Sequence, residues 1–158
     1  MKDSEDRTRS TEPRPTGALA TPDAPLPQPS PDNAAFYEAA QRGELRFQCC
    51  TDCGRFRHYP RPACPDCLSR RYTWERSSGR GQVYTWTIVR GPTLPAFADK
   101  LPYNVVDVLM DEGVHFVSEI LDCAPDQIHA GLRVVATFVS VSDDVTLVKF
   151  RREASSDE

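Results

Sequence analysis

The segment that decides the fold contains Cys50-Thr-Asp-Cys53-Gly54 and Cys64-Pro-Asp-Cys67, with ten residues between Cys53 and Cys64. A Cys-x2-Cys turn places two thiolates on one side of a metal ion, and two such turns complete the tetrahedral set that zinc prefers. Gly54 fits this arrangement, because the residue after the turn needs a positive φ angle. The predicted ligands of a Zn²⁺ ion are Cys50, Cys53, Cys64 and Cys67. Four protein ligands leave no open position for a substrate, so the predicted role of the zinc is structural.

Two cysteines stand outside this pattern. Cys49 with Cys53 would form a Cys-x3-Cys pair, which is a poorer metal-binding turn, so we interpret Cys49 as a neighbour of the site. Cys123 lies far along the chain, and its local sequence supplies no basic group to activate it. We expect a small, partly buried thiol there. A disulfide framework is not expected, since the N-terminus has no apolar signal segment and the sequence is typical of a cytoplasmic protein.

The segment before the cysteines divides into a tail and a helix. Residues 1–31 hold seven of the 14 prolines and few large aliphatic side chains, which predicts a disordered, extended tail. Asp32 or Asn33 can cap a helix over Ala34–Arg42. Gly43 then ends that helix, because glycine is typical of the position after a last helical turn.

After Gly81 the sequence pattern becomes β. Val83–Val89 is rich in aromatic and β-branched residues and predicts a long strand. Its alternate residues Tyr84, Trp86 and Ile88 are expected to share one face packed inward. Four more strands are predicted at Tyr103–Met110, Val114–Leu121, Val134–Val139 and Val145–Phe150. Five strands of this length close most readily into a small barrel, of which the OB-fold is the commonest version.

The predicted organisation is mostly β, with one N-terminal helix, a small zinc ribbon and a five-stranded OB-fold barrel. The predicted boundaries are a disordered tail in 1–31, the helix in 32–44, the zinc ribbon in 45–78, the OB-fold domain in 79–152 and a second disordered tail in 153–158.

The charge is distributed unevenly along the chain. The formal net charge is −4, yet residues 42–80 hold nine arginines against four acidic residues, and residues 81–150 hold four basic residues against nine acidic ones. The arginine-rich segment suits a phosphate group or an acidic partner, or it is simply a solvated surface. The acidic barrel disfavours nucleic acid, whose binding depends on local positive charge. A membrane span is excluded, because no apolar run approaches the roughly 20 residues that it needs.

Several short motifs, taken in order over residues 36–150, resemble the domain of unknown function 35 (DUF35) family. Besides the two cysteine pairs, the matching residues are Phe36-Tyr37-Glu38, Gly43-Glu44-Leu45, Pro60-Arg61-Pro62, Gly79-x-Gly81-x-Val83-Tyr84, Pro102-Tyr103, Asp111-Glu112-Gly113 and Gly131-Leu132-x-Val134. The resemblance implies a helix, a rubredoxin-like zinc ribbon and an OB-fold. Cys49 and the long N-terminal tail depart from the family pattern.

The resemblance also implies a function. DUF35 proteins accompany thiolase-like enzymes, including acyl-CoA thiolases and the aldolases that shorten steroid side chains. The expected function is that of a non-catalytic accessory subunit, in a heterotetramer, that supports the partner's acyl-CoA binding in lipid or steroid degradation. Some relatives carry a hot-dog-fold hydratase domain, for which this chain is too short, so that activity is expected in another subunit. The alternative is a free-standing module that binds acyl-CoA or single-stranded nucleic acid.

Two groups of residues are candidates for these contacts. The loop over 90–102 is long and pinned by prolines, which is typical of a functional loop. The predicted partner-binding residues are Phe36, Tyr37, Leu94 and Phe97. An alternative for Leu94 and Phe97 is that they cap the open end of the barrel. The arginines predicted to contact CoA phosphates are Arg57, Arg61 and Arg90.

No independent active site is expected. The histidines are His58, His115 and His129, and none has a recognisable partner in the sequence. Asp143 and Asp144 are adjacent, which favours a turn over a pair of catalytic carboxylates. The glycines at 79 and 81 are too few to form a phosphate-binding loop.

Overall fold

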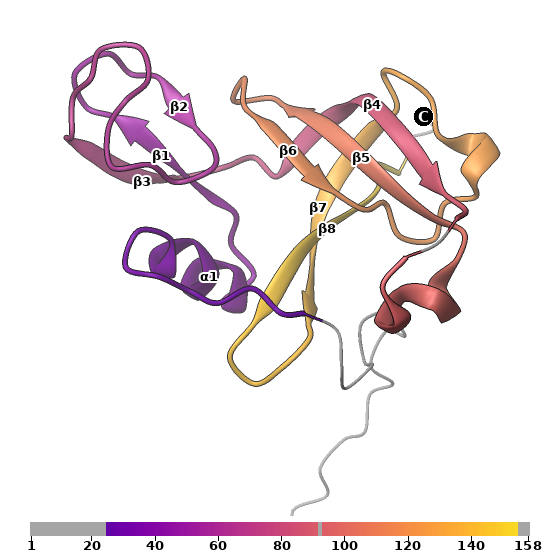
Figure 1. The fold of residues 1–158 in the computed structure, drawn as a ribbon. Helices are drawn as coiled ribbons and strands as arrows, with labels where there is room; N and C mark the ends of the chain where they lie inside the picture. Colours follow the sequence, from indigo (N-terminus) through magenta and orange to yellow (C-terminus); the bar gives the residue numbers. More distant parts are fainter. Residues whose placement is uncertain (1–24, 92, 155–158) are drawn as a thin grey trace, which may run out of the picture.

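The computed structural model describes residues 25–91 and 93–154. The parts of the two predicted tails in 1–24 and 155–158 therefore lie outside the described residues. The described elements, in chain order, are α1 (Ala34–Gln41), β1 (Arg46–Cys50), β2 (Phe56–Arg57), β3 (Tyr72–Arg76), β4 (Arg80–Val89), η1 (Pro95–Lys100), β5 (Tyr103–Met110), β6 (His115–Ser118), η2 (Pro125–Gln127), β7 (Arg133–Ser140) and β8 (Thr146–Arg152). Figure 1 shows β1–β3 on one side, the larger sheet on the other, and α1 below β1–β3. Within the described ranges, no helix has the length and apolar character needed to span a membrane.

The helix α1 connects the two sheets. It packs against β1 of the small sheet and against β8 of the large one. Its buried side chains are Phe36, Ala39 and Ala40. Asn33 occupies the N-cap position without a side-chain capping bond, because its Oδ1 atom instead accepts a hydrogen bond from the Ser30 N–H at 2.6 Å. Gly43 follows the helix with a φ of 73°, as the sequence predicts.

The small sheet has the strand order β2-β1-β3, and both pairings are antiparallel. Its central strand is β1, which leads directly into the first cysteine turn. Phe47 and Gln48 are each 1 % exposed. The two-residue strand β2 is held beside β1 by the pair of Arg57 and Gln48, whose Nε and Oε1 atoms are 2.6 Å apart.

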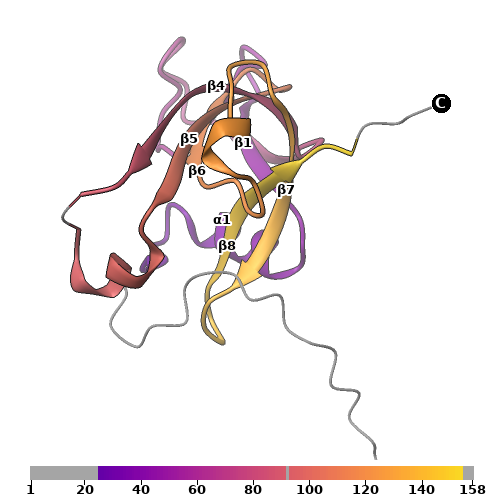
Figure 2. The same cartoon turned by 90° about the vertical axis from the view of Figure 1, so that its right-hand side faces the viewer.

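The large sheet has the strand order β6-β5-β4-β7-β8, with every neighbouring pair antiparallel. The sheet curls over its core, as the turned view in Figure 2 shows, and the segment that follows β6 meets β8. The seam is a short parallel bridge between Ile120 and Phe150. There the Leu121 N–H donates to the Phe150 carbonyl at 2.8 Å, and the Phe150 N–H donates to the Glu119 carbonyl at 2.9 Å. The predicted five-stranded, OB-like architecture is confirmed.

One apolar core runs through both sheets. Phe47 of β1 and Phe116 of β6 belong to the same buried cluster, with ring centroids 6.3 Å apart. The His58 ring stacks on Phe116 at 4.4 Å and an interplanar angle of 8°. Phe150, which is fully buried, meets Phe116 edge-on at 5.6 Å. The small sheet is therefore joined to the barrel by shared aromatic packing and not by the chain alone.

The inward face predicted for Tyr84, Trp86 and Ile88 is wrong in part. The pairing of β4 with β5 shifts between Val83 and Thr85, so that Tyr84 is an extra residue in a β-bulge. Tyr84 is 60 % exposed and Trp86 38 % exposed, whereas Ile88 packs against the core. Val83 is buried instead, although a strict alternation with Tyr84, Trp86 and Ile88 facing inward would place it on the outer face.

Candidate metal centre and contact surfaces

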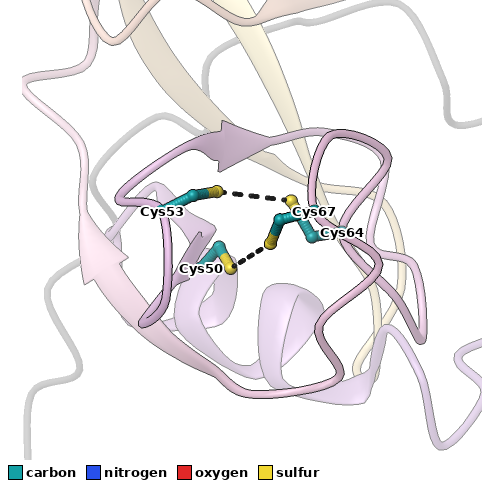
Figure 3. A group of neighbouring side chains, drawn as sticks. All are labelled: Cys50, Cys53, Cys64 and Cys67. Atoms are coloured by element: carbon teal, nitrogen blue, oxygen red, sulfur yellow. Dashed lines mark hydrogen bonds between the residues drawn. The ribbon is translucent and has the colours of Figure 1, made fainter.

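The two cysteine pairs converge at the tip of the small sheet. The Sγ atoms of Cys50, Cys53, Cys64 and Cys67 all lie within 4.8 Å of one another. In Figure 3 the pairs face each other, with Cys50 opposite Cys67 at 3.5 Å and Cys53 opposite Cys64 at 3.6 Å. A tetrahedron of thiolates about 2.3 Å from a Zn²⁺ ion has edges of about 3.8 Å. The separation of the four sulfur atoms therefore fits zinc.

The two turns that carry these thiols have the same backbone geometry. The Gly54 N–H donates to the Cys50 carbonyl at 2.8 Å, and the Leu68 N–H donates to the Cys64 carbonyl at 2.9 Å. Gly54 has the positive φ that the sequence predicts, 72°. Leu68 has a φ of 61°, a backbone conformation that a residue with a Cβ atom adopts only with strain. The second turn therefore repeats the first without its glycine.

The pKa values of the four thiols depend on one another. Backbone N–H groups of Cys67 and Asp66 lower the pKa of Cys64 to about 6. The Arg55 N–H lowers the pKa of Cys53, but burial and the other three thiols together raise it to about 12. Four negative charges at this spacing repel one another, whereas a divalent cation allows all four thiols to ionise. The ribbon is therefore a structural zinc site by the chemistry of its donors.

The remaining cysteines lie outside the cluster. Cys49 is half-buried, and its Sγ donates to the Gly54 carbonyl at 3.4 Å, which makes it a neighbour of the first turn, as expected. Cys123 is half-buried and packs against the core. Burial raises the pKa of both thiols, so neither has the depressed pKa of a reactive cysteine.

The arginines of the ribbon largely have partners within it. Arg55 forms a two-pronged ion pair with Asp66, at 3.0 and 3.1 Å, which ties the first cysteine turn to the second. Arg71 forms another with Asp52. These pairs neutralise part of the basic charge that the sequence places in this segment, which weakens the interpretation of the ribbon as a phosphate-binding surface.

The prediction that Arg57 contacts a CoA phosphate is corrected by its burial. Arg57 is 4 % exposed, its Nη2 donates to the Arg61 carbonyl at 3.1 Å, and its guanidinium lies 4.9 Å above the Tyr72 ring. It therefore holds the ribbon loop in place. Arg61 and Arg90 are exposed, so their predicted contact with phosphate stays a prediction.

The predicted partner-binding residues fall into two separate places. Phe36 is 8 % exposed and belongs to the core. It is therefore not the exposed partner contact that the sequence analysis predicted. Phe36 and Tyr37 line a cavity of about 450 Å³ beside β6 and β8. On the other loop, Leu94 is 57 % exposed. Phe97 is half-buried, with its ring 6.1 Å from that of Tyr103.

The histidines are better connected than the sequence reveals. His115 Nδ1 lies 3.0 Å from a carboxylate oxygen of Asp107, because β5 and β6 pair there. His58 lines the same cavity as Phe36 and Tyr37, and burial lowers its pKa to about 4. His129 is exposed and contacts the Ala130 carbonyl. The His115–Asp107 partnership was missed, since strand register is needed to find it.

This geometry defines a class of protein: a rubredoxin-like zinc ribbon followed by an OB-fold. Two family descriptions match, "ChsH2, rubredoxin-like zinc ribbon domain" over residues 38–73 and "ChsH2, C-terminal OB-fold domain" over residues 74–139. A DUF35 domain-containing scaffold protein of Methanothermobacter thermautotrophicus is 33 % identical over 105 residues, which are 66 % of this chain and 78 % of that protein. The chain belongs to the DUF35 family.

Other relatives are longer proteins. A probable enoyl-CoA hydratase alpha subunit of Thermomonospora curvata is 34 % identical over 96 % of this chain and 46 % of its own length. The 3-oxo-4,17-pregnadiene-20-carboxyl-CoA hydratase alpha subunit of Mycobacterium tuberculosis is 32 % identical over 77 % of this chain and 39 % of its own length. The chain thus spans less than half the length of these two relatives.

Two solved structures share the fold. A chain of the Ltp2-ChsH2(DUF35) aldolase is 36 % identical, with a TM-score of 0.73, over 80 % of this chain and 98 % of that one. A DUF35 protein of unknown function from Sulfolobus solfataricus has a TM-score of 0.52 at 14 % identity, over 78 % of this chain and 87 % of that one. The second likeness is one of fold alone.

Proposed function

We propose that this chain is a non-catalytic accessory subunit that binds a thiolase-like enzyme, of the thiolase or steroid side-chain aldolase type, and supports its acyl-CoA binding. The observation that carries the proposal is the likeness to the Ltp2-ChsH2(DUF35) aldolase, in which 98 % of the matched chain is covered at 36 % identity. A match of nearly the whole chain supports a shared role more strongly than one that covers part of a longer protein.

The chemistry of the described residues supports a scaffold more than a catalyst. The thiols of the ribbon are assigned to zinc, with Cys50, Cys53, Cys64 and Cys67 as the proposed ligands, and the other two cysteines have raised pKa values. We propose domain boundaries at 32–44 for the helix, 45–78 for the ribbon and 79–152 for the barrel. In this arrangement the ribbon stabilises one end of the molecule. The barrel and the loop over 90–102 that contains η1, called the η1 loop below, can then contact a partner.

The names of two relatives favour a second candidate partner. Both are called hydratase alpha subunits, and more than half of each lies outside the part that matches this chain. A hydratase subunit would then take the place of the thiolase-like enzyme, and the chain's own role as an accessory subunit would be unchanged.

The test is affinity capture of the tagged full-length chain from its native host, with mass spectrometry of the captured proteins and light scattering of the complex. We expect a thiolase-like protein in a near-equal molar ratio and a mass that corresponds to a heterotetramer. A captured hydratase would support the second candidate. A chain that remains alone at native expression would contradict the proposal and favour a free-standing module.

The proposed contact on the η1 loop is tested with Leu94→Asp and Phe97→Asp. Leu94 is exposed, so a carboxylate there would weaken an apolar interface by tenfold or more without disturbing the core. The matched control is Tyr84→Asp, which changes an exposed residue of β4 that lines neither cavity beside α1 and η1 and should leave capture unchanged. If capture of the partner survives both loop substitutions, the interface lies elsewhere. Phe36 is unsuitable for this test, because its substitution would disturb the core.

A further inference from the structure

An exposed stripe of side chains crosses the outer face of the large sheet, from the ribbon loop to β4. We call it the outer stripe, and its members are Tyr59, Val117, Asp107, His115 and Tyr84. Tyr59, Tyr84 and Val117 are 55 %, 60 % and 48 % exposed. The three strands that carry the stripe, β4, β5 and β6, are neighbours in the sheet (Figure 1). Large apolar side chains that gather on a surface mark a contact site.

Contacts connect the members of the outer stripe from one end to the other. The Tyr84 ring meets the His115 ring edge-on, with centroids 5.0 Å apart, and His115 Nδ1 lies 3.0 Å from a carboxylate oxygen of Asp107. Asp107 pairs with Val117 across β5 and β6. Burial and the Asp107 carboxylate raise the pKa of Tyr59, and a hydrogen bond to the Val117 backbone opposes that shift. The five side chains therefore form one continuous surface.

The outer stripe carries a negative charge without a permanent cation beside it. The ion-pair partner of Asp107 among the described residues is His115, and the charge of a histidine is not permanent at neutral pH. By contrast, Asp111, Glu119 and Asp122 each pair with an arginine or a lysine. The surface therefore suits a ligand that brings a positive charge to Asp107 and apolar rings to the tyrosines.

The chain itself contains a segment with this chemistry. Residues 7–15 read Arg-Thr-Arg-Ser-Thr-Glu-Pro-Arg-Pro, with three arginines against one glutamate. Proline-rich segments dock on surfaces lined by aromatic side chains, and they lose little conformational entropy when they bind. Residues 7–15 belong to the long N-terminal tail and precede the residues that the structure describes.

The tail is long enough to reach the outer stripe. Ser30 lines the same cavity as Tyr59 and Val117, so the described part of the tail passes one border of the stripe. Arg14 precedes Ser30 by 16 residues, a length that spans at most about 55 Å when extended. Three neighbouring strands span only about 10 Å. Residues 7–15 can therefore cover the stripe within the same chain.

We propose that residues 7–15 dock on the outer stripe of the same chain. The Arg14 guanidinium pairs with the Asp107 carboxylate, and the prolines on either side of Arg14 lie against the exposed tyrosine rings. The docked segment covers apolar surface and gives the carboxylate a permanent cation. No member of the stripe belongs to the η1 loop, so this inference does not depend on the proposed function, and release of the tail should leave capture of the partner unchanged.

The test is ¹⁵N relaxation of the backbone amides in the full-length, zinc-loaded chain at neutral pH. Rigid backbone has an order parameter of about 0.85, and flexible backbone has one below about 0.6. We expect the amides of Arg14 and Thr16 to resemble those of β5, and the amides of residues 3–6 to relax as a free terminus. Flexible amides at both Arg14 and Thr16 would overturn the proposal.

Substitutions in the stripe locate the contact. Asp107→Asn removes the charge and keeps the shape, and Tyr84→Ser removes an exposed ring, so each should lower the order parameters of Arg14 and Thr16 below about 0.6. Lys2→Gln is the control, because it removes a positive charge of the tail outside residues 7–15, and it should change neither value. Rigid Arg14 and Thr16 amides in both stripe variants would refute the site. Rigid amides found only in a species of doubled mass, measured by light scattering, would contradict docking within one chain.

Discussion

The zinc ribbon and the OB-fold barrel are stabilised in different ways. At the tip of the ribbon, β2 has only two residues and most of β3 is exposed. The buried thiols Cys50 and Cys64 therefore take the place of an apolar core there. In the barrel, Val106, Val134 and Phe150 are fully buried. A short segment with few apolar contacts depends on its metal, whereas a closed sheet depends on packing. The two regions should therefore fail under different perturbations.

The largest expected effect is the loss of zinc. Structural zinc sites contribute on the order of 10–16 kcal/mol of apparent binding free energy, more than the tip of the ribbon can replace. Cys64→Ser should abolish zinc binding, measured by elemental analysis, and should expose the amides of residues 50–71 to hydrogen exchange while those of β5 and β7 stay protected.

The matched control for this experiment is Cys49→Ser. Cys49 neighbours the site but lies outside the cluster of four sulfur atoms, so zinc content should remain at one ion per chain. Loss of zinc in this variant would show that Cys49 is a ligand and that the assignment of Cys50 is wrong.

A smaller effect is expected from a change in the barrel core. Here the barrel should lose stability while the zinc site is retained. Phe150→Ala removes a fully buried ring that meets Phe116 edge-on, and such truncations cost about 3–5 kcal/mol. The free energy of unfolding measured in urea should fall by that amount, with a lower midpoint, while the folded variant keeps its zinc. If zinc is released well before the barrel unfolds, the two regions are less tightly joined than their common core suggests.

The smallest expected effect lies at the junction of the two regions. His58 is held neutral in the fold, since burial lowers its pKa from 6.5 to about 4. Above pH 6.5 the folded and unfolded states are both neutral at this side chain. As the pH falls from 6.5 to 4 only the unfolded state binds the proton, so the free energy of unfolding decreases, by at most about 3 kcal/mol.

Chemical denaturation between pH 7 and pH 4 measures this dependence. His58→Phe should flatten it over that window, because the ring is replaced by one that does not titrate. His129→Gln is the control, since His129 is exposed, and its profile should match the wild type. Identical profiles for wild type and His58→Phe would show that folding does not lower the pKa of His58.

Much of the fold follows from local sequence. The metal turns need only their spacing and Gly54, and the strand predicted at Tyr103–Met110 is confirmed residue for residue as β5. The inward face of β4 could not be predicted, because the bulge at Tyr84 interrupts the period of two on which the prediction depends. A bulge is set by the partner strand, and a single strand carries no sign of it.

The surroundings of the site were harder to predict than the cysteine cluster itself. The sequence does not reveal that Arg57 is enclosed by Gln48 and Tyr72, since these contacts join three strands. The burial of Phe36 depends in the same way on residues of the barrel far along the chain. The prolines and length of the 90–102 segment indicated an unusual loop, but only the fold places Lys100 beside Lys149 and Glu119.

The stacking of His58 on Phe116 has a mechanical consequence. Because helix, ribbon and barrel share one aromatic core, we expect the ribbon and the barrel to move together as one rigid body. A partner that binds at the metal tip would therefore also set the position of β6.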